Sequence, residues 1–225
     1  MAERIKLHPV TPHVKRIFEI ADKIKRGAVV LFPTDSQYAL GCEYTNKKGI
    51  ERIRNIRGMA DDDHLTILCE SLSGISIFAH ISDHNFKLIK RLIPGPYTFI
   101  LPATKKVPKL LVHPKKRTVG IRVPDYPICE LLGREVGNPL VSITAKTPSL
   151  GDAALKRMER EPFLREFDKL VDLIIDNQQA LPHRETSVLD LTGERAAIVR
   201  EGLGIEKIEE VFMTQGEALG EVHVK

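Results

Sequence analysis

The stretch AVVLFPTDSQYALG, residues 28–41, begins as an apolar run and continues as a polar loop. The run at 28–32 is too short for an isolated helix and rich in strand-forming residues, so it predicts a buried strand that ends before Pro33. Hydroxyl and carboxylate side chains follow, and Gly41 closes the segment. Open α/β sheets bind ligands on loops of this kind. The alternative is a turn in which Asp35 and Ser36 bond only their own backbone.

Helical and strand patterns alternate along the rest of the chain. Helices are predicted at 13–26, 46–57, 83–92, 127–136 and 153–170, and strands at 65–69, 97–101, 118–123, 140–144, 171–175, 187–191 and 196–200. Asn46 is expected to cap the second helix. The alternation predicts an α/β sheet with parallel pairs, and the short strands near the C-terminus add antiparallel pairing. We predict one domain over 13–205, an N-terminal segment at 1–12, and a C-terminal helix and polar tail at 206–225.

Composition excludes several classes of protein. The 225 residues include 34 Lys and Arg and 30 Asp and Glu, a net charge of +4 that suits anionic ligands but does not by itself indicate nucleic acid. Three widely spaced cysteines without a CxxC pair favour a reducing compartment, and we expect a cytoplasmic protein. No apolar run approaches the roughly 20 residues of a membrane span, so no membrane partner is expected.

Common catalytic and metal motifs do not stand out. The chain has no GxxxxGK[ST] segment, and Gly202-Leu203-Gly204 is a fragment of GxGxxG near the wrong end of the chain. The run DDDH at 61–64 suits a solvated turn better than a metal cluster, so no metal site is predicted. No serine or cysteine has the context of a catalytic nucleophile.

Dispersed polar residues remain as candidates. Four arginines lie near the ends of predicted elements and together suit an anion-binding cleft, although each alone is an ordinary surface charge: Arg57, Arg117, Arg122 and Arg200. Three hydroxyls at the ends of predicted strands can reach such a cleft or bond their own main chain: Ser142, Thr144 and Ser187.

Seven blocks in order carry a resemblance to a known family: PTDSQYALG (33–41), HLTILC (64–69), PGPYTFIL (94–101), TVGIRVPDYP (118–127), SITA (142–145), TSVLDLT (186–192) and IVREGLG (198–204). With these blocks, the chain resembles the YrdC family over about residues 13–205. That family includes the threonylcarbamoyl-AMP synthases, and the residues within the blocks are most similar to those of its YciO-like branch. The resemblance implies a YrdC-like α/β fold, a twisted open mixed sheet with flanking helices and a basic concave cavity.

The resemblance also implies an activity. The family's synthases condense L-threonine, bicarbonate and ATP, with Mg²⁺, into threonylcarbamoyl-AMP and pyrophosphate. A partner complex transfers the threonylcarbamoyl group to an adenosine of tRNA. A nucleotidyltransferase linked to tRNA modification is therefore expected. Two alternatives stay open: a module that binds tRNA, double-stranded RNA or a nucleotide without turnover, and a related hydrolase. The absence of Trp and the presence of only four Tyr disfavour stacking on single strands.

Site residues follow from the resemblance position by position. Thr34 and Tyr38 match the loop that holds the amino acid, while Thr98 and Arg122 match the PGPxT and RxP blocks, so all four are expected to bind substrate. The expected nucleotide-binding residues are Arg57, Ser142, Thr144, Ser187 and Arg200. Thr34, Arg57 and Ser142 are the expected catalytic residues.

Three positions depart from the synthase pattern, and one of them, a lysine replaced by arginine, keeps its charge. Arg57 replaces the lysine of a KxR pair, whose arginine falls on Met59, and the asparagine of an SxN pair falls on Thr144. Methionine lacks the charge, and threonine lacks the amide donors. We therefore expect weak synthase activity.

Overall fold

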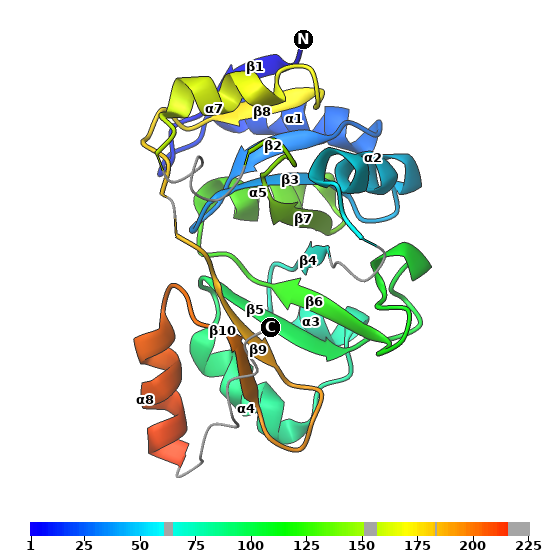
Figure 1. The fold of residues 1–225 in the computed structure, drawn as a ribbon, viewed down its shortest axis with the longest axis vertical. Helices are drawn as coiled ribbons and strands as arrows, with labels where there is room; N and C mark the ends of the chain where they lie inside the picture. The colour runs from blue at the N-terminus through cyan, green and yellow to red at the C-terminus, as the bar shows by residue number, and fades with distance from the viewer. Residues whose placement is uncertain (61–64, 151–156, 183, 216–225) are drawn as a thin grey trace. The chain divides into compact units, whose positions relative to one another are not determined.

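The strands and helices of the computed structural model fall into two units, and its mixed α/β class agrees with the sequence-based prediction (Figure 1). The structure describes residues 1–60, 65–150, 157–182 and 184–215. Unit 1 comprises Met1–Asp63 and Tyr126–His183, and unit 2 comprises His64–Asp125 and Arg184–Lys225. A single domain over 13–205 stays a prediction.

The described residues of unit 1 form five strands in the order β1-β8-β2-β3-β7. Their bounds are β1 Glu3–Lys6, β2 Val30–Pro33, β3 Tyr38–Glu43, β7 Leu140–Thr144 and β8 Leu173–Asp176. Strands β1 and β2 are parallel to β8, whereas β3 is antiparallel to both β2 and β7. The carboxyl ends of β8, β2 and β7 therefore lie at one edge of the sheet. The helices are α1 Val14–Lys25, α2 Lys47–Arg57, α5 Pro127–Val136 and α7 Arg160–Phe167.

The core of unit 1 follows from helical periodicity and one glycine. Ile17, Ile20 and Ile24 of α1 are fully buried, and α1 packs against α5; each such side chain contributes about 1.5–3 kcal/mol. At Gly41, a Cβ would lie 2.7 Å from the Phe32 ring and 2.5 Å from the Val141 carbonyl oxygen. Glycine therefore lets β3 sit between its two neighbours.

The prediction for residues 33–41 was partly wrong. Pro33 is the last residue of β2 and pairs with Tyr38, so the loop is only 34–37 and β3 follows at once. Proline is tolerated there because a terminal strand position can do without the missing N–H. Gly41, which we expected to close a loop, lies inside β3, where it is needed for close packing.

Unit 2, as far as the structure describes it, also has five strands, in the order β4-β6-β5-β9-β10. Their bounds are β4 Thr66–Leu68, β5 Tyr97–Pro102, β6 Thr118–Arg122, β9 Ser187–Asp190 and β10 Ala197–Arg200. The β4–β6 and β5–β9 pairs are parallel, and the β5–β6 and β9–β10 pairs are antiparallel, which confirms the predicted antiparallel pairing near the C-terminus. The helices are α3 Leu72–Phe78, α4 Asp83–Leu92 and α8 Ile205–Gln215, with a 3₁₀ turn η1 at Lys109–Leu111; α4 and α8 pack together.

Most predicted elements are present, and the differences concern short or charged segments. Strand β1 and helix α3 were missed because four and seven residues show little periodicity. The predicted helix at 153–170 is confirmed only over Arg160–Phe167, and residues 151–156 lie outside the described ranges. The predicted C-terminal helix is α8, but the polar tail at 216–225 lies outside them too. Within the described residues, no helix combines the length and apolar character needed to cross a membrane.

The predicted cap of α2 is confirmed and gives a test of local stability. Asn46 Oδ1 accepts the Gly49 N–H at 3.0 Å, and its Nδ2 donates to Gly27 O at 3.0 Å. Asn46→Ala should lower the free energy of unfolding by about 1–2 kcal/mol, because it removes both bonds. Urea unfolding measures the change, with Lys48→Ala on the exposed side of α2 as the control. Equal losses in the two variants would contradict the capping role.

Candidate functional site

The residues predicted to form a site are divided between the two units. Unit 1 holds Thr34, Tyr38, Arg57, Ser142 and Thr144, and unit 2 holds Thr98, Arg122, Ser187 and Arg200. In each unit, most of the set lies at one edge of the strands. The assignment of these residues to substrate and nucleotide stays a prediction, and their local geometry is described unit by unit.

The loop at 34–37 of unit 1 is organised by Thr34. Thr34 is buried, and its hydroxyl donates to Gln37 O at 2.6 Å and accepts the Ser36 and Gln37 N–H groups at 3.2 and 3.3 Å. The sequence analysis considered this kind of side-chain-to-backbone bonding for Asp35 and Ser36. In the structure, Thr34 is the residue at its centre. The bonds hold the loop in one conformation directly after β2.

Strand register brings the Thr34 loop and Thr144 to the same edge of unit 1. Pro33 pairs with Tyr38, and the next residue, Ala39, pairs with Thr144. Ser142 pairs with Gly41 two steps further in, on the same face of β7 as Thr144. Hydroxyl groups of β2 and β7 thus gather at the carboxyl edge of a sheet, the usual place for ligands in α/β folds.

The third strand that ends at this edge contributes a residue that the sequence analysis missed. Asn177, directly after β8, accepts the Tyr38 hydroxyl on Oδ1 at 2.9 Å and returns its own N–H to the Tyr38 oxygen at 3.2 Å. Its Nδ2 donates to the Tyr126 hydroxyl at 2.9 Å. Burial raises the pKa of both Tyr38 and Tyr126, so both phenols are protonated near neutral pH. In the sequence, the one signal that pointed to Asn177 was its position after a predicted strand.

A buried carboxylate holds α7 to the same end of β8. Asp176 is 5% exposed and forms an ion pair with Arg160 of α7. It also accepts the Gln178 N–H at 2.8 Å, and Gln178 adopts the left-handed conformation with φ 59°. The Asp176 carboxylate raises the pKa of the Arg160 guanidinium, which stays charged. This pair fixes the backbone that carries Asn177.

Arg57 lies at the C-terminal end of α2, also in unit 1. It is half-buried, and Gly58 ends the helix in the left-handed conformation with φ 60°. A Cβ on Gly58 would approach Pro148 Cγ to 2.9 Å. The Met59 N–H then donates to Arg54 O at 3.0 Å, so the half-buried Met59 lies immediately past the helix end.

In unit 2, Thr98 and Arg200 converge on Thr186. The Thr98 and Thr186 hydroxyls are 3.3 Å apart. Arg200 donates from Nε to Thr186 O at 3.0 Å and from Nη2 to Thr186 Oγ1 at 2.8 Å, and its Nη1 lies 3.4 Å from Glu185 Oε2. Arg122 ends β6 at the same edge, one residue after Ile121, which pairs with Phe99 of β5. Arg122 is buried, whereas the Arg200 side chain is 39% exposed.

Ser187 faces a different way from its neighbour Thr186. Its hydroxyl donates to Leu203 O and accepts the Gly202 N–H, both at 3.0 Å, and the residue is fully buried. The structure therefore does not bring Ser187 into the cluster of Thr98, Thr186 and Arg200. Because side chains alternate along a strand, a one-residue shift decides which hydroxyl meets Arg200. That alternation was the signal that could have singled out Thr186.

Two of the three cysteines, Cys42 and Cys69, offer no reactive thiolate. Burial raises the pKa of Cys42 and of Cys69 to about 12, so both thiols are protonated at neutral pH. Among the described residues, no three His, Cys, Asp or Glu side chains gather as a metal site. The DDDH run at 61–64 lies outside the described residues.

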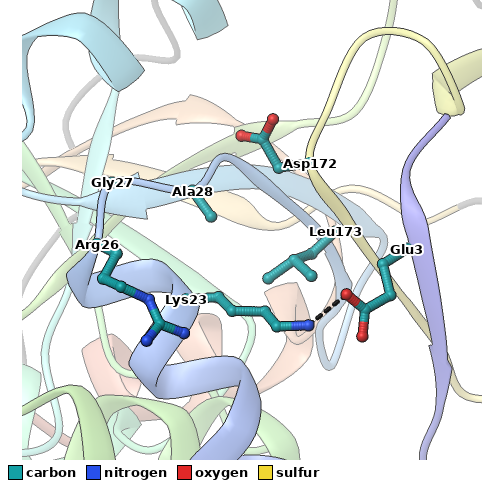
Figure 2. Close-up of a pocket in the computed structure, with 7 residues that line it drawn as sticks. All are labelled: Glu3, Lys23, Arg26, Gly27, Ala28, Asp172 and Leu173. Atoms are coloured by element: carbon teal, nitrogen blue, oxygen red, sulfur yellow. Dashed lines mark hydrogen bonds and ion pairs between the residues drawn. The ribbon is translucent and has the colours of Figure 1, made fainter.

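A hollow of about 410 Å³ in unit 1 contains none of the predicted site residues (Figure 2). Its lining consists of Glu3, Lys23, Arg26, Gly27, Ala28, Asp172 and Leu173. Lys23 forms an ion pair with Glu3, while Asp172 accepts the Val29 N–H at 2.8 Å and an Arg52 guanidinium at 2.8 Å. Because these charges already have partners inside the protein, the hollow is not the candidate site.

Comparison with known proteins identifies the family. The family model Sua5_yciO_yrdC, described as "Telomere recombination", matches residues 22–202. The protein named uncharacterized protein YciO of Escherichia coli is 36% identical over 204 residues, which cover 91% of this chain and 97% of YciO. The chain belongs to the Sua5/YciO/YrdC family.

Solved structures of the Sua5/YciO/YrdC family agree with this assignment. The crystal structure of E. coli YciO has a TM-score of 0.82 at 35% identity and covers 92% of this chain and 99% of YciO. Pyrococcus abyssi Sua5 complexed with L-threonine has a TM-score of 0.78 at 25% identity; the match covers 94% of this chain but only 60% of Sua5. The threonylcarbamoyl-AMP synthase of Vibrio vulnificus is 26% identical over 192 residues, which cover 84% of this chain and 100% of that synthase.

The Tyr38–Asn177–Tyr126 contacts at the carboxyl edge of unit 1 give a second stability test. Tyr38→Phe should lower the free energy of unfolding by about 1–3 kcal/mol at pH 8, because the side-chain Oδ1 and the backbone N–H of the buried Asn177 each lose a hydrogen bond. Tyr126→Phe, which removes one bond, should cost less. Urea unfolding of both variants gives the order. A Tyr38→Phe protein as stable as wild type would contradict the role of this network.

The same variant has a defined pH dependence. The pKa of Tyr38 is raised above its ordinary 10.0 in the folded protein, so above pH 10 the unfolded chain loses a proton that the folded chain keeps. The stabilisation by the phenol is complete below pH 10 and is lost as pH rises toward the folded pKa, by up to about 1.4 kcal/mol per pH unit. The stability gap between wild type and Tyr38→Phe should therefore be smaller at pH 11 than at pH 8.

Proposed function

We propose that this protein is a nucleotidyltransferase related to the threonylcarbamoyl-AMP synthases, which condenses L-threonine, bicarbonate and ATP into threonylcarbamoyl-AMP and pyrophosphate. The main support is its likeness, over nearly the whole chain, to a Sua5 complexed with L-threonine. The proposal links the protein to tRNA modification.

The side chains suit the two parts of this reaction. Thr34 and Ser142 orient the amino acid and the adenylate, and Tyr38, whose hydroxyl is bonded to Asn177, binds the amino acid with Thr34. Arg57, Arg122 and Arg200 are to neutralise phosphate charge, since guanidinium forks match phosphate oxygens. Thr98 and Thr144 are the remaining polar positions, and Thr186, which bonds Arg200, replaces the fully buried Ser187 in the proposal. Mg²⁺ is to enter with ATP and be held through its phosphates, because the described residues include no carboxylate cluster.

The proposed step needs little covalent chemistry from the protein. A carbamate oxygen of N-carboxythreonine attacks the α-phosphorus of ATP; the new O–P bond forms as the bond to the pyrophosphate oxygen breaks, and pyrophosphate leaves with the electron pair. Orientation of the two anions and neutralisation of their charge account for the rate. Protonated thiols at Cys42 and Cys69 agree with a mechanism that uses no cysteine nucleophile.

Two features favour weak turnover. Met59 stands where the synthase pattern has an arginine, and Thr144 where it has an asparagine. The same departures are what a nucleotide-binding module without turnover would show. Mass spectrometry of a reaction containing L-threonine, bicarbonate, ATP and Mg²⁺ separates the two: threonylcarbamoyl-AMP above a no-enzyme control supports the synthase, whereas ATP binding without product supports the module.

Arg200→Ala tests the phosphate contact. It should weaken ATP binding by roughly 1.5–3 kcal/mol, a tenfold to 150-fold rise in dissociation constant, as expected for losing a hydrogen bond to a charged group. Isothermal titration calorimetry measures it. Arg195→Ala, an exposed arginine before the same strand, is the matched control. An unchanged dissociation constant in a folded Arg200→Ala protein would remove Arg200 from the site.

Met59→Arg combined with Thr144→Asn tests whether these two departures from the synthase pattern limit the reaction. The double variant should raise the rate of threonylcarbamoyl-AMP formation about tenfold, because a guanidinium adds phosphate charge and an amide adds oriented donors. Met59→Leu with Thr144→Val, which adds neither a guanidinium nor an amide, is the control. A thermal melt of each variant checks the fold. A double variant that melts like wild type but is no faster would show that these two positions do not limit the reaction.

A further inference from the structure

The Asn177 side chain in unit 1 can take only one orientation. Its Oδ1 accepts the backbone N–H of Gln179 at 3.2 Å as well as the Tyr38 hydroxyl at 2.9 Å. A backbone N–H can only donate, so the atom that faces Gln179 has to be the amide oxygen, and Nδ2 then faces Tyr126. Turning the buried amide over would place two donors against each other.

This orientation fixes the direction of the hydrogen bonds at both phenols. Tyr38 donates its proton to Oδ1 and accepts the Asn177 N–H at 3.2 Å, so it can meet a ligand only with its ring or as an acceptor. The Tyr126 oxygen accepts from Asn177 Nδ2 at 2.9 Å, so the Tyr126 proton points away from the amide. Burial raises the pKa of the Tyr126 phenol, which therefore keeps this proton near neutral pH.

The Tyr126 proton has no acceptor among the residues that the structure describes. Tyr126 is half-buried, whereas Tyr38 is 3% exposed. Hydroxyl donors in folded proteins are as a rule satisfied by protein, water or ligand. The Tyr126 hydroxyl is therefore a donor whose partner has to come from outside the described chain.

Tyr126 lies at the edge of unit 1 that carries the candidate site. It is the residue before α5, and in the first turn of that helix Cys129 Sγ donates to Pro33 O at 3.5 Å. Pro33 directly precedes Thr34, the centre of the loop that follows β2. Through Asn177, Tyr126 is also bonded to the residue that follows β8. Tyr126 thus belongs to the same edge as the loop proposed to bind the amino acid.

We propose that the Tyr126 hydroxyl donates a hydrogen bond to the carboxylate of the bound amino acid, and that Asn177 is the positioning residue that keeps this proton free. The inference rests on the proposed function, in which L-threonine binds at this edge. The ammonium group of L-threonine can only donate, whereas its carboxylate only accepts and is charged, so the carboxylate is the strongest partner for a phenol proton. The proposed reaction changes the nitrogen of L-threonine and leaves its carboxylate intact. The contact therefore serves binding equally before and during the reaction.

Isothermal titration calorimetry with L-threonine tests the contact. Tyr126→Phe should raise the dissociation constant about 10- to 100-fold, as expected for the loss of a hydrogen bond to a charged group. Tyr44→Phe is the matched control and should bind like wild type, because Tyr44 follows the carboxyl end of β3, at the opposite edge of the sheet. In the turnover assay, Tyr126→Phe should raise the KM for L-threonine and leave kcat unchanged.

L-2-Aminobutyrate identifies the ligand group that Tyr126 meets, because it lacks the hydroxyl of L-threonine but keeps the carboxylate. Tyr126→Phe should weaken the binding of both amino acids by the same factor. A loss confined to L-threonine would show that Tyr126 meets the hydroxyl of the ligand, and would overturn the inference.

Asn177→Asp tests the positioning role. The new carboxylate has no N–H for the Tyr126 oxygen, so the Tyr126 proton turns toward it and is lost to the ligand. L-Threonine binding should weaken about tenfold, and the same substitution should change little in the Tyr126→Phe background, which has no proton to redirect. An equal loss in both backgrounds would mean that the added charge repels the ligand, and would remove Asn177 from this role. If urea unfolding shows that Asn177→Asp is not folded, Tyr126→Phe with the two amino acids decides.

Failure of the inference differs from failure of the proposed function. A wild-type protein that does not bind L-threonine overturns both. A wild-type protein that binds L-threonine, together with a folded Tyr126→Phe protein that binds it equally well, overturns the inference alone. A loss of affinity in Tyr126→Phe without formation of threonylcarbamoyl-AMP by the wild type supports the contact and contradicts the synthase.

Discussion

The position of β3 between β2 and β7 is the constraint on which the rest of unit 1 depends. Because β3 is antiparallel to both neighbours, β2 and β7 run in the same direction, and β8, parallel to β2, joins them. The carboxyl ends of β2, β7 and β8 then share one edge and bring Thr34, Thr144 and Asn177 to it. The arrangement needs Gly41, because any Cβ there would collide with the Phe32 ring and the backbone of β7.

Buried polar groups make this edge rigid. A buried donor or acceptor without a partner costs about 1–3 kcal/mol, so each group at the edge has to be satisfied by a specific neighbour. The Thr34 hydroxyl donates a hydrogen bond to the backbone of the turn that follows β2. The Asn177 side chain hydrogen-bonds to the hydroxyls of Tyr38 and Tyr126. A site built on such contacts is already organised before a ligand arrives, which is what catalysis by orientation requires.

Charge is distributed unevenly within unit 2, and its two concentrations differ in kind. At one edge, Arg200 is held by Thr186 and lies near Glu185, and Arg122 is buried, so a few cations are placed accurately. On the β5–β6 connection, exposed lysines supply charge without directional partners. Accurately placed guanidinium groups suit a small phosphorylated ligand.

Local sequence signals were enough to predict many of the helices and strands of this protein. Asn46 and Gly58 marked the two ends of α2, Pro127 marked the start of α5, and the apolar spacing of α1 identified its buried face. These features act within a few residues, so the sequence alone contains their physical cause. The ordered motif blocks also pointed to the family that the comparisons then showed.

Other features were decided only by tertiary structure, because their partners are far away in the chain. Strand β1 exists by pairing with β8, about 170 residues later, and its four residues carry no pattern of their own. Asn177 became part of the candidate site through Tyr38, and Thr186, rather than Ser187, met Arg200 because of strand register. The sequence by itself determined most of the helices, the cap of α2 and the family. The direction and register of the strands, set by long-range pairing, decided which of the hydroxyls and arginines lie together.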